Sequence, residues 1–173
     1  PELVPWQYLL GRGVTIFLLL NLYLFFEEGI DFYKNYKRIG WSGLIGGTGL
    51  GIAMISFIWS ITNTSAAVTL LCLAAMPFMT AFLGFLFLHE KISFNVWVAI
   101  ILASIGIIII AIGNFSAGTL FGLLFGLASA LGFSVFSVSL RWRKETPKFT
   151  TVAIAGLLCA IVSIVILVET DSN

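Results

Sequence analysis

Long apolar runs separated by short polar stretches dominate this chain of 173 residues. Six runs are long enough to cross a hydrocarbon layer of about 30 Å as α-helices, which rise about 1.5 Å per residue. The predicted spans are residues 8–26, 39–61, 66–88, 94–113, 120–140 and 150–168. Every connection between them is short, so we predict an all-α, polytopic transmembrane helix bundle.

Composition supports a membrane protein. Hydrophobic residues make up 60% of the chain and charged residues only 10%, whereas soluble domains carry about 25% charged residues. The net charge is +1 and the basic residues lie in short loops, so the expected partner is a lipid bilayer and not nucleic acid. Cys72 and Cys159 fall in the middle of apolar runs, and we expect buried thiols there instead of a disulfide.

Eight of the nine lysines and arginines lie on one side of the predicted bundle, and the ninth is Arg12 on the other side. Cytoplasmic loops carry an excess of lysine and arginine. This rule predicts that loops 27–38, 89–93 and 141–149 are cytoplasmic and that both ends of this chain face outward. The expected location is the plasma membrane, specifically a bacterial inner membrane, with several passes.

A five-part pattern surrounds the third span. It consists of a polar entry at 63–67, Pro77 in mid-span, Glu90 at the end of the span, Trp97 in the next span and a glycine-containing aliphatic run at 104–110. In this order and spacing the pattern resembles the end of an EamA-type repeat in the drug/metabolite transporter (DMT) superfamily. The resemblance implies ten helices in two inverted repeats of five helices each.

A weak internal similarity agrees with such a repeat. Pro1 and Pro147, 146 positions apart, each precede a few polar residues and an apolar span, on opposite sides of the membrane. We therefore expect residues 1–113 to hold helices two to five of the first EamA-like repeat and residues 114–173 to hold helices six and seven. Helix one and helices eight to ten would then lie outside this chain.

Small residues recur every four positions in two spans, and such stripes let another helix approach closely. Packing is the simpler interpretation, and a sliding surface for alternating access is the functional one. The two stripes are Gly43, Gly47 and Gly51, and Gly118, Gly122, Gly126 and Ala130.

Familiar catalytic patterns are missing from the sequence. His89 and Glu90 lack the second histidine of a zinc-binding helix, and the two aspartates, Asp31 and Asp171, lie in loops. We therefore expect no metal site, no cofactor, no catalytic residue and a protein that is not an enzyme.

In each of three spans, polar and aromatic residues lie together on one helical face. Such faces either satisfy neighbouring helices or line a central substrate cavity, which the resemblance places between the two repeats. The cavity candidates are Ser56, Trp59 and Asn63 in the second span, Thr69, Cys72, Met76, Pro77 and Thr80 in the third, and Ser129, Phe133 and Ser137 in the fifth.

Two charged residues are gate candidates. Arg12 lies about one turn into the first span, where it can anchor the helix by reaching the surface, or serve an outer gate or an anionic substrate group. Glu90 matches the glutamate at the cytoplasmic end of the family's fourth helix. We expect it to contribute to a cytoplasmic gate or hinge.

The resemblance implies a secondary transporter that exports small organic metabolites or drug-like compounds by alternating access. An interior rich in Phe, Trp, Ser and Thr suits an uncharged or zwitterionic substrate. A homodimer is also compatible with the sequence. A polytopic membrane enzyme remains an alternative, as does a non-transporting scaffold or channel subunit.

Overall fold

The computed structural model describes residues 4–113 and 117–171, and these residues are helical apart from short connections. No strand occurs in that part of the chain, which confirms the all-α prediction. The helices are α1 (Val4–Glu28), the 3₁₀ helix η1 (Gly29–Phe32), α2 (Tyr33–Arg38), α3 (Gly40–Asn63), α4 (Ala66–Leu73), α5 (Met76–Leu88), α6 (Phe94–Gly113), α7 (Ala117–Trp142) and α8 (Lys148–Asp171).

Five helical stretches are long and apolar enough to cross a membrane: Pro5–Arg38, Gly40–Asn63, Ala66–Leu88, Leu120–Trp142 and Lys148–Glu169. The sixth predicted span is α6, whose bounds Phe94–Gly113 are those expected from the sequence. The predicted polytopic bundle is therefore confirmed. The expected boundary between the repeats, at 113/114, adjoins residues 114–116, which lie outside the described part.

Residues 29–38 differ from the sequence expectation, because they form η1 and α2 where a loop was predicted. Gly29 (φ 64°) and Gly40 (φ 57°) allow the chain to turn before and after this segment. Tyr36 donates a hydrogen bond of 2.8 Å to Asn21, and Asn35 donates one of 2.6 Å to Glu28. These bonds fold α2 back onto the end of α1.

The third predicted span is not one helix but two, α4 and α5, separated by a turn at Ala74 and Ala75. Pro77 lacks an N–H and its ring excludes the carbonyl four residues earlier, so it breaks a helix interior but fits the first turn of a new helix. It occupies that first turn in α5. The Ser134 hydroxyl of α7 lies 3.1 Å from the Met76 carbonyl and 2.8 Å from the Ala130 carbonyl of its own helix, so a neighbouring helix places a hydrogen-bond donor beside the break.

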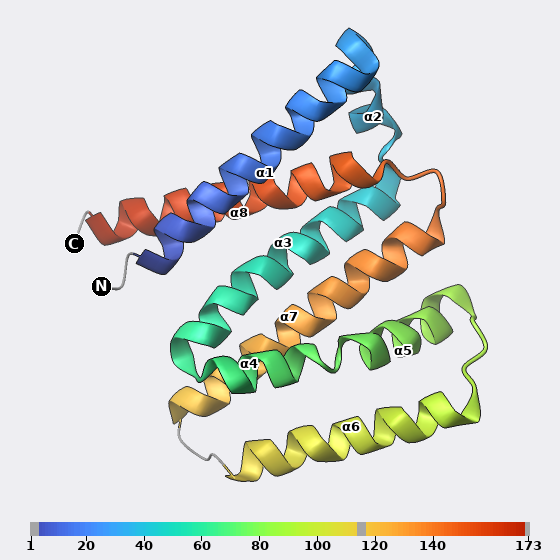
Figure 1. Cartoon of the computed structure of the whole chain (residues 1–173), viewed down its shortest axis with the longest axis vertical. Coiled ribbons are helices and arrows are strands. Elements are labelled where there is room, and N and C mark those ends of the chain that lie inside the picture. The colour runs from blue at the N-terminus through green and yellow to red at the C-terminus, as the bar shows by residue number, and fades with distance from the viewer. Residues whose placement is uncertain (1–3, 114–116, 172–173) are drawn as a thin grey trace.

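Helices α3 and α7 form the centre of the bundle and make its most extensive helix contact (Figure 1). On one side α8 packs against α3 and is crossed by α1. On the other side α4 and α5 pack against α7, and α6 packs against α5. Segment α2, loop 89–93 and the α7–α8 connection lie at one end of the bundle, which we call the basic end. The start of α1, the end of α8 and the α3–α4 connection lie at the opposite end.

Helix α3 has two glycine faces. A Cβ added to Gly47 would lie 2.9 Å from the Thr151 carbonyl oxygen of α8, and one added to Gly51 would lie 3.2 Å from Leu158. Gly49 instead faces α7, where its Cβ would lie 3.2 Å from the Gly132 carbonyl oxygen. The predicted packing role of the glycines in the second span is therefore confirmed.

The small residues of α7 face the junction of α3 and α4. A Cβ on Gly122 would lie 2.5 Å from the Thr64 side chain, and one on Gly126 would lie 2.9 Å from Cys72 Cβ. Ala130 is fully buried. These positions pack as predicted, while the surroundings of Gly118 lie outside the described residues.

Candidate functional site

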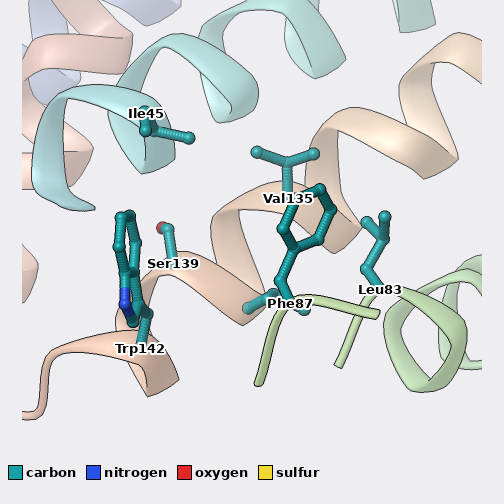
Figure 2. A pocket seen from close by; sticks show the side chains of 7 residues that line it. Ile45, Leu83, Phe87, Val135, Ser139 and Trp142 are labelled. Carbon is teal, nitrogen blue, oxygen red and sulfur yellow. The ribbon is translucent and has the colours of Figure 1, made fainter. Parts of the chain in front are cut away.

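A cavity of about 400 Å³ opens between α3, α5 and α7 near the basic end. Figure 2 shows side chains from the three helices around it. Its polar groups are the Trp142 indole and the Ser139 hydroxyl, which donates a hydrogen bond of 2.8 Å to the Phe136 carbonyl. We call it the apolar cavity; its lining residues are Ile45, Leu83, Phe87, Val135, Val138, Ser139 and Trp142.

A second cavity, of about 340 Å³, lies between α5, loop 89–93, the start of α6 and the end of α7. We call it the polar cavity, because it contains both charges of an ion pair, a lysine and two hydroxyl side chains. Three of the predicted site residues meet here, namely Pro77, Thr80 and Glu90. The remaining lining residues are Ala81, Lys91, Ile92, Ser93, Val96 and Arg141.

Glu90 pairs with Arg141 in this polar cavity. Arg141 Nη1 lies 2.9 Å from Glu90 Oε2 and 3.2 Å from Oε1, and Arg141 Nη2 donates to the Thr80 carbonyl at 3.4 Å. The two charged side chains are 42% and 41% exposed. The pair therefore joins the α5–α6 hairpin to α7 across 51 residues of sequence.

The backbone at the end of α5 places the Glu90 carboxylate. His89 adopts a left-handed conformation (φ 55°, ψ 30°), and the Gly84 carbonyl accepts hydrogen bonds from the N–H groups of His89 and Glu90. A Cβ on Gly84 would lie 2.6 Å from Glu90 Oε2. Gly84 is therefore the residue that leaves room for the carboxylate beside Arg141.

Hydroxyl groups at the opposite end of the bundle form hydrogen bonds between helices, and Thr69 and Ser129 among them are predicted cavity residues. Ser60 donates a hydrogen bond of 2.7 Å to the Gly122 carbonyl, and its hydroxyl lies 2.9 Å from that of Thr69. Cys72 and Ser129 contact the carbonyls of α7 and α3, at 3.8 Å to Leu123 and 2.8 Å to Ala53 respectively. These residues connect α3, α4 and α7.

Replacing Ser60 with alanine tests the strength of this network. We expect a loss of about 1 kcal/mol in stability, because hydrogen bonds between membrane helices contribute about 0.6 to 1.7 kcal/mol. Thr62→Ala is the matched control, since the hydrogen bonds of the Thr62 hydroxyl with described residues stay within α3: it donates to the Ile58 and Trp59 carbonyls and accepts from the Asn63 amide. Thermal unfolding in detergent measures both, and equal midpoints for the two variants would contradict the expectation.

An aromatic cluster lies at the same end of the bundle. Trp59 stacks on Phe125 at a centroid distance of 5.6 Å and meets Trp6 edge to face at 5.3 Å. Asn63 is exposed, and its amide donates to the Trp59 carbonyl of its own helix at 2.8 Å. Trp6 and Phe125 were not among the predicted site residues, since each looks like an ordinary apolar residue of its own span.

The remaining candidates do not converge on one cavity. Ser56 is buried in α3, Phe133 packs against the hydrophobic core, and Ser137 is half-buried. Met76 contributes its carbonyl to the contact with Ser134. None of the eleven predicted cavity residues lines the apolar cavity.

Helix α1 begins at Val4, four residues before the predicted span, so Arg12 lies eight residues, or about 12 Å, from the start of the helix. Its side chain is partly buried and forms no hydrogen bond or ion pair with another described residue.

Metal ligands do not gather in the described part of the chain, where no group of three or more His, Cys, Asp or Glu residues could hold an ion. Cys72 and Cys159 are buried free thiols, as predicted.

Comparison with known proteins agrees with the helical architecture. Residues 2–112 match the model of the EamA-like transporter family. An "Uncharacterized transporter" of Helicobacter pylori (strain J99 / ATCC 700824) is 25% identical over 144 residues, which make up 82% of this chain and 47% of that protein. The chain thus spans about half the length of this relative, and no solved structure matches it significantly. Since the family model covers more than half of the chain, this multi-pass membrane protein belongs to the EamA-like transporter family.

Proposed function

We propose that the chain is part of a secondary transporter that exports small organic metabolites or drug-like compounds by alternating access. Family membership supports transport, and the observation that carries the proposal is the break between α4 and α5 beside cavities. Broken membrane helices form substrate sites because irregular backbone is tolerated only where it is buried in protein or lines a cavity. Pro77, at this break, lines the polar cavity.

The two cavities favour a substrate with an apolar body and a polar end. The apolar cavity and the polar cavity both take residues from α5 and α7. The polar cavity has Arg141 and Lys91 as cations and Glu90 as an anion. A zwitterionic or uncharged amphiphilic solute therefore suits this region better than a strongly ionic one.

The lysines and arginines at the basic end favour a cytoplasmic location for that end, in a bacterial inner membrane. On this orientation the Glu90–Arg141 pair lies on the cytoplasmic side. It connects the last hairpin of the proposed first repeat to the first helix of the proposed second repeat.

We infer that this ion pair is a cytoplasmic gate. Exposed ion pairs contribute only about 0 to 1 kcal/mol to stability. A contribution to folding therefore does not explain by itself why Gly84 and the left-handed His89 are placed so that the Glu90 carboxylate meets Arg141. A weak contact suits a gate, because small differences in interaction energy shift the populations of closed and open states.

Flux measurements test the proposal. The complete protein in proteoliposomes is expected to show saturable uptake or efflux of at least one compound from a panel of labelled amino acids, nucleosides and cationic drugs. Comparison with and without a pH gradient assigns proton coupling. Folded, inserted protein that moves none of the panel would contradict the carrier and favour the enzyme or scaffold alternatives.

A further inference from the structure

Two segments that are far apart in the sequence meet at the basic end of the bundle. The connection between α7 and α8 runs beside the bend between α2 and α3 (Figure 1). A Cβ added to Gly40, the residue at this bend, would lie 2.9 Å from Arg143 Nη1. The guanidinium of Arg143 therefore lies against the backbone of the bend, two residues from Arg38.

Hydrogen bonds fix the α7–α8 connection against α3. The hydroxyls of Ser42 and Thr146 are hydrogen bonded to each other across 104 residues of sequence, and Thr146 is only 4% exposed. The Thr146 N–H also donates to the Arg143 carbonyl at 3.0 Å. The chain turns around this buried threonine, and Arg143, Lys144 and Glu145 are left exposed.

The end of α2 is fixed in a similar way. Tyr36 donates a hydrogen bond to Asn21 of α1, and Ile39 is only 5% exposed. Arg38 lies between these two anchored residues and is exposed. The fold therefore sets the position of Arg38 as well as that of Arg143.

Four exposed cations lie in these two segments, and we call them the basic patch: Arg38, Arg143, Lys144 and Lys148. None of the four side chains forms a hydrogen bond or an ion pair with another residue in the described part of the chain. Like charges that share a small surface repel one another, so the basic patch favours a bound anion.

Carboxylates of the protein do not supply this anion. The two ion pairs among the described residues lie elsewhere, between Lys34 and Asp31 and between Arg141 and Glu90. Glu145 lies in the α7–α8 connection itself, but within residues 4–113 and 117–171 it forms no ion pair. One carboxylate beside four cations leaves the basic patch strongly positive.

Exposed aromatic side chains place the basic patch at the membrane surface. Trp41 follows the bend and is 78% exposed, and Phe149 follows Lys148 and is 50% exposed. They are the second residues of the membrane-spanning helices α3 and α8. Tryptophan is enriched at the two interfaces of a bilayer, where its ring lies at the level of the lipid headgroups. The cations of the basic patch therefore lie at the depth of the headgroups of one leaflet.

We propose that the basic patch binds the phosphate group of an anionic phospholipid in the leaflet at the basic end. A guanidinium presents parallel N–H donors that match the oxygens of a phosphate, and lysines add positive charge. Basic pockets between membrane helices recognise anionic headgroups in this way. A soluble anion would meet the same cations, but only a lipid also covers Trp41 and Phe149 with its acyl chains. The proposal concerns lipid binding and does not depend on transport.

Thermal unfolding of the complete protein tests the binding. In micelles that contain phosphatidylcholine, added phosphatidylglycerol with the same acyl chains is expected to raise the melting temperature by several degrees, because a ligand of the folded state stabilises that state. Further phosphatidylcholine is the control lipid. Equal gains from the two lipids would overturn the proposal.

Single charge removals locate the site. Arg38→Gln and Arg143→Gln are each expected to raise the phosphatidylglycerol concentration needed for half of the stabilisation about fivefold. Lys34→Gln is the matched control, since it removes one charge from α2 that Asp31 already neutralises at 2.8 Å. We expect a change of less than about twofold for this control. Equal effects of all three variants would indicate a general attraction to the surface and overturn the site.

Fluorescence quenching tests the unaltered patch. Phosphatidylglycerol brominated near the headgroup end of its acyl chains is compared with phosphatidylcholine brominated at the same position, in bilayers that contain both lipids. The emission of Trp41 is obtained as the difference between the protein and its Trp41→Phe variant. We expect this emission to be quenched several-fold more effectively by the brominated phosphatidylglycerol. Equal quenching by the two lipids would contradict a lipid site beside Trp41.

Two soluble anions distinguish the sources of the charge. Glycerol phosphate carries the phosphate group without acyl chains, and polyglutamate carries the carboxylates of an acidic protein. If either raised the melting temperature in phosphatidylcholine as much as phosphatidylglycerol does, the patch would belong to a free phosphate or to a protein partner, and the lipid proposal would be overturned. No response to either anion supports the lipid. None of these readouts measures flux, so a failure of transport and a failure of lipid binding are observed separately.

Discussion

Replacing Gly132 with leucine is expected to prevent stable folding of the bundle. A Cβ at this position would lie 2.5 Å from the Gly49 carbonyl oxygen and 2.9 Å from Ala53 Cβ, both on α3. Overpacking typically costs about 1 to 3 kcal/mol, and we expect about 3 kcal/mol or more here because a backbone oxygen, unlike a side-chain tip, cannot rotate away. Since α3 and α7 form the centre of the bundle, the loss affects the whole molecule.

Gly106→Leu is the matched control. Gly106 is also in a helix interior, and a Cβ there would meet nothing within 4 Å. Both variants replace glycine with leucine inside a helix, so the favourable change in helix propensity is the same in both. The difference between their melting temperatures in detergent therefore measures the effect of overpacking at Gly132. Similar melting temperatures for the two variants would contradict the close approach of α3 and α7.

Local apolar length was sufficient to predict the six spans, because a bilayer requires about 20 consecutive apolar residues whatever their neighbours. The predicted bounds of α6 agree with the structure residue for residue. The break at Pro77 was less predictable. A proline in a membrane helix can either bend it or end it, and here the turn is accompanied by a hydrogen bond from Ser134, 58 residues away.

The cavities were harder to predict than the helices. Ile45, Phe87 and Val135 line the apolar cavity, but in the sequence they are indistinguishable from residues that face lipid. Hydroxyl residues are ambiguous in another way, because in the sequence a buried serine such as Ser129 looks the same whether it meets a substrate or the Ala53 carbonyl. The sequence pattern predicted Glu90 as a gate candidate. It did not predict Arg141 as the ion-pair partner of Glu90, because no local pattern relates positions 90 and 141.

Exchanging the charges of Glu90 and Arg141 is expected to separate a gate from a simple anchor. The single variants Glu90→Arg and Arg141→Glu place like charges where the ion pair now lies, at 2.9 Å. If closure of the basic end depends on this pair, each reduces flux in proteoliposomes by about tenfold or more, equivalent to about 1.4 kcal/mol in a barrier. The double variant restores the attraction and is expected to recover much of the flux.

Stability distinguishes the two roles further. Because both side chains are about two-fifths exposed, removing the attraction with Glu90→Gln is expected to change the free energy of unfolding by about 1 kcal/mol or less. Flux is expected to fall all the same, since a gate acts on the balance between open and closed states and not on folding. Normal flux in Glu90→Gln would contradict the gate.

A second ion pair provides the control for charge removal as such. Lys34 and Asp31 lie 2.8 Å apart within η1 and α2, away from both cavities, with side chains 49% and 64% exposed. Asp31→Asn is expected to leave flux and stability unchanged.

If the double exchange of Glu90 and Arg141 fails to recover flux while the protein remains folded, Arg141 has a role that its charge alone does not explain. Contact with the polar end of the substrate in the polar cavity would then be the next hypothesis to test, by comparing zwitterionic and uncharged members of the panel.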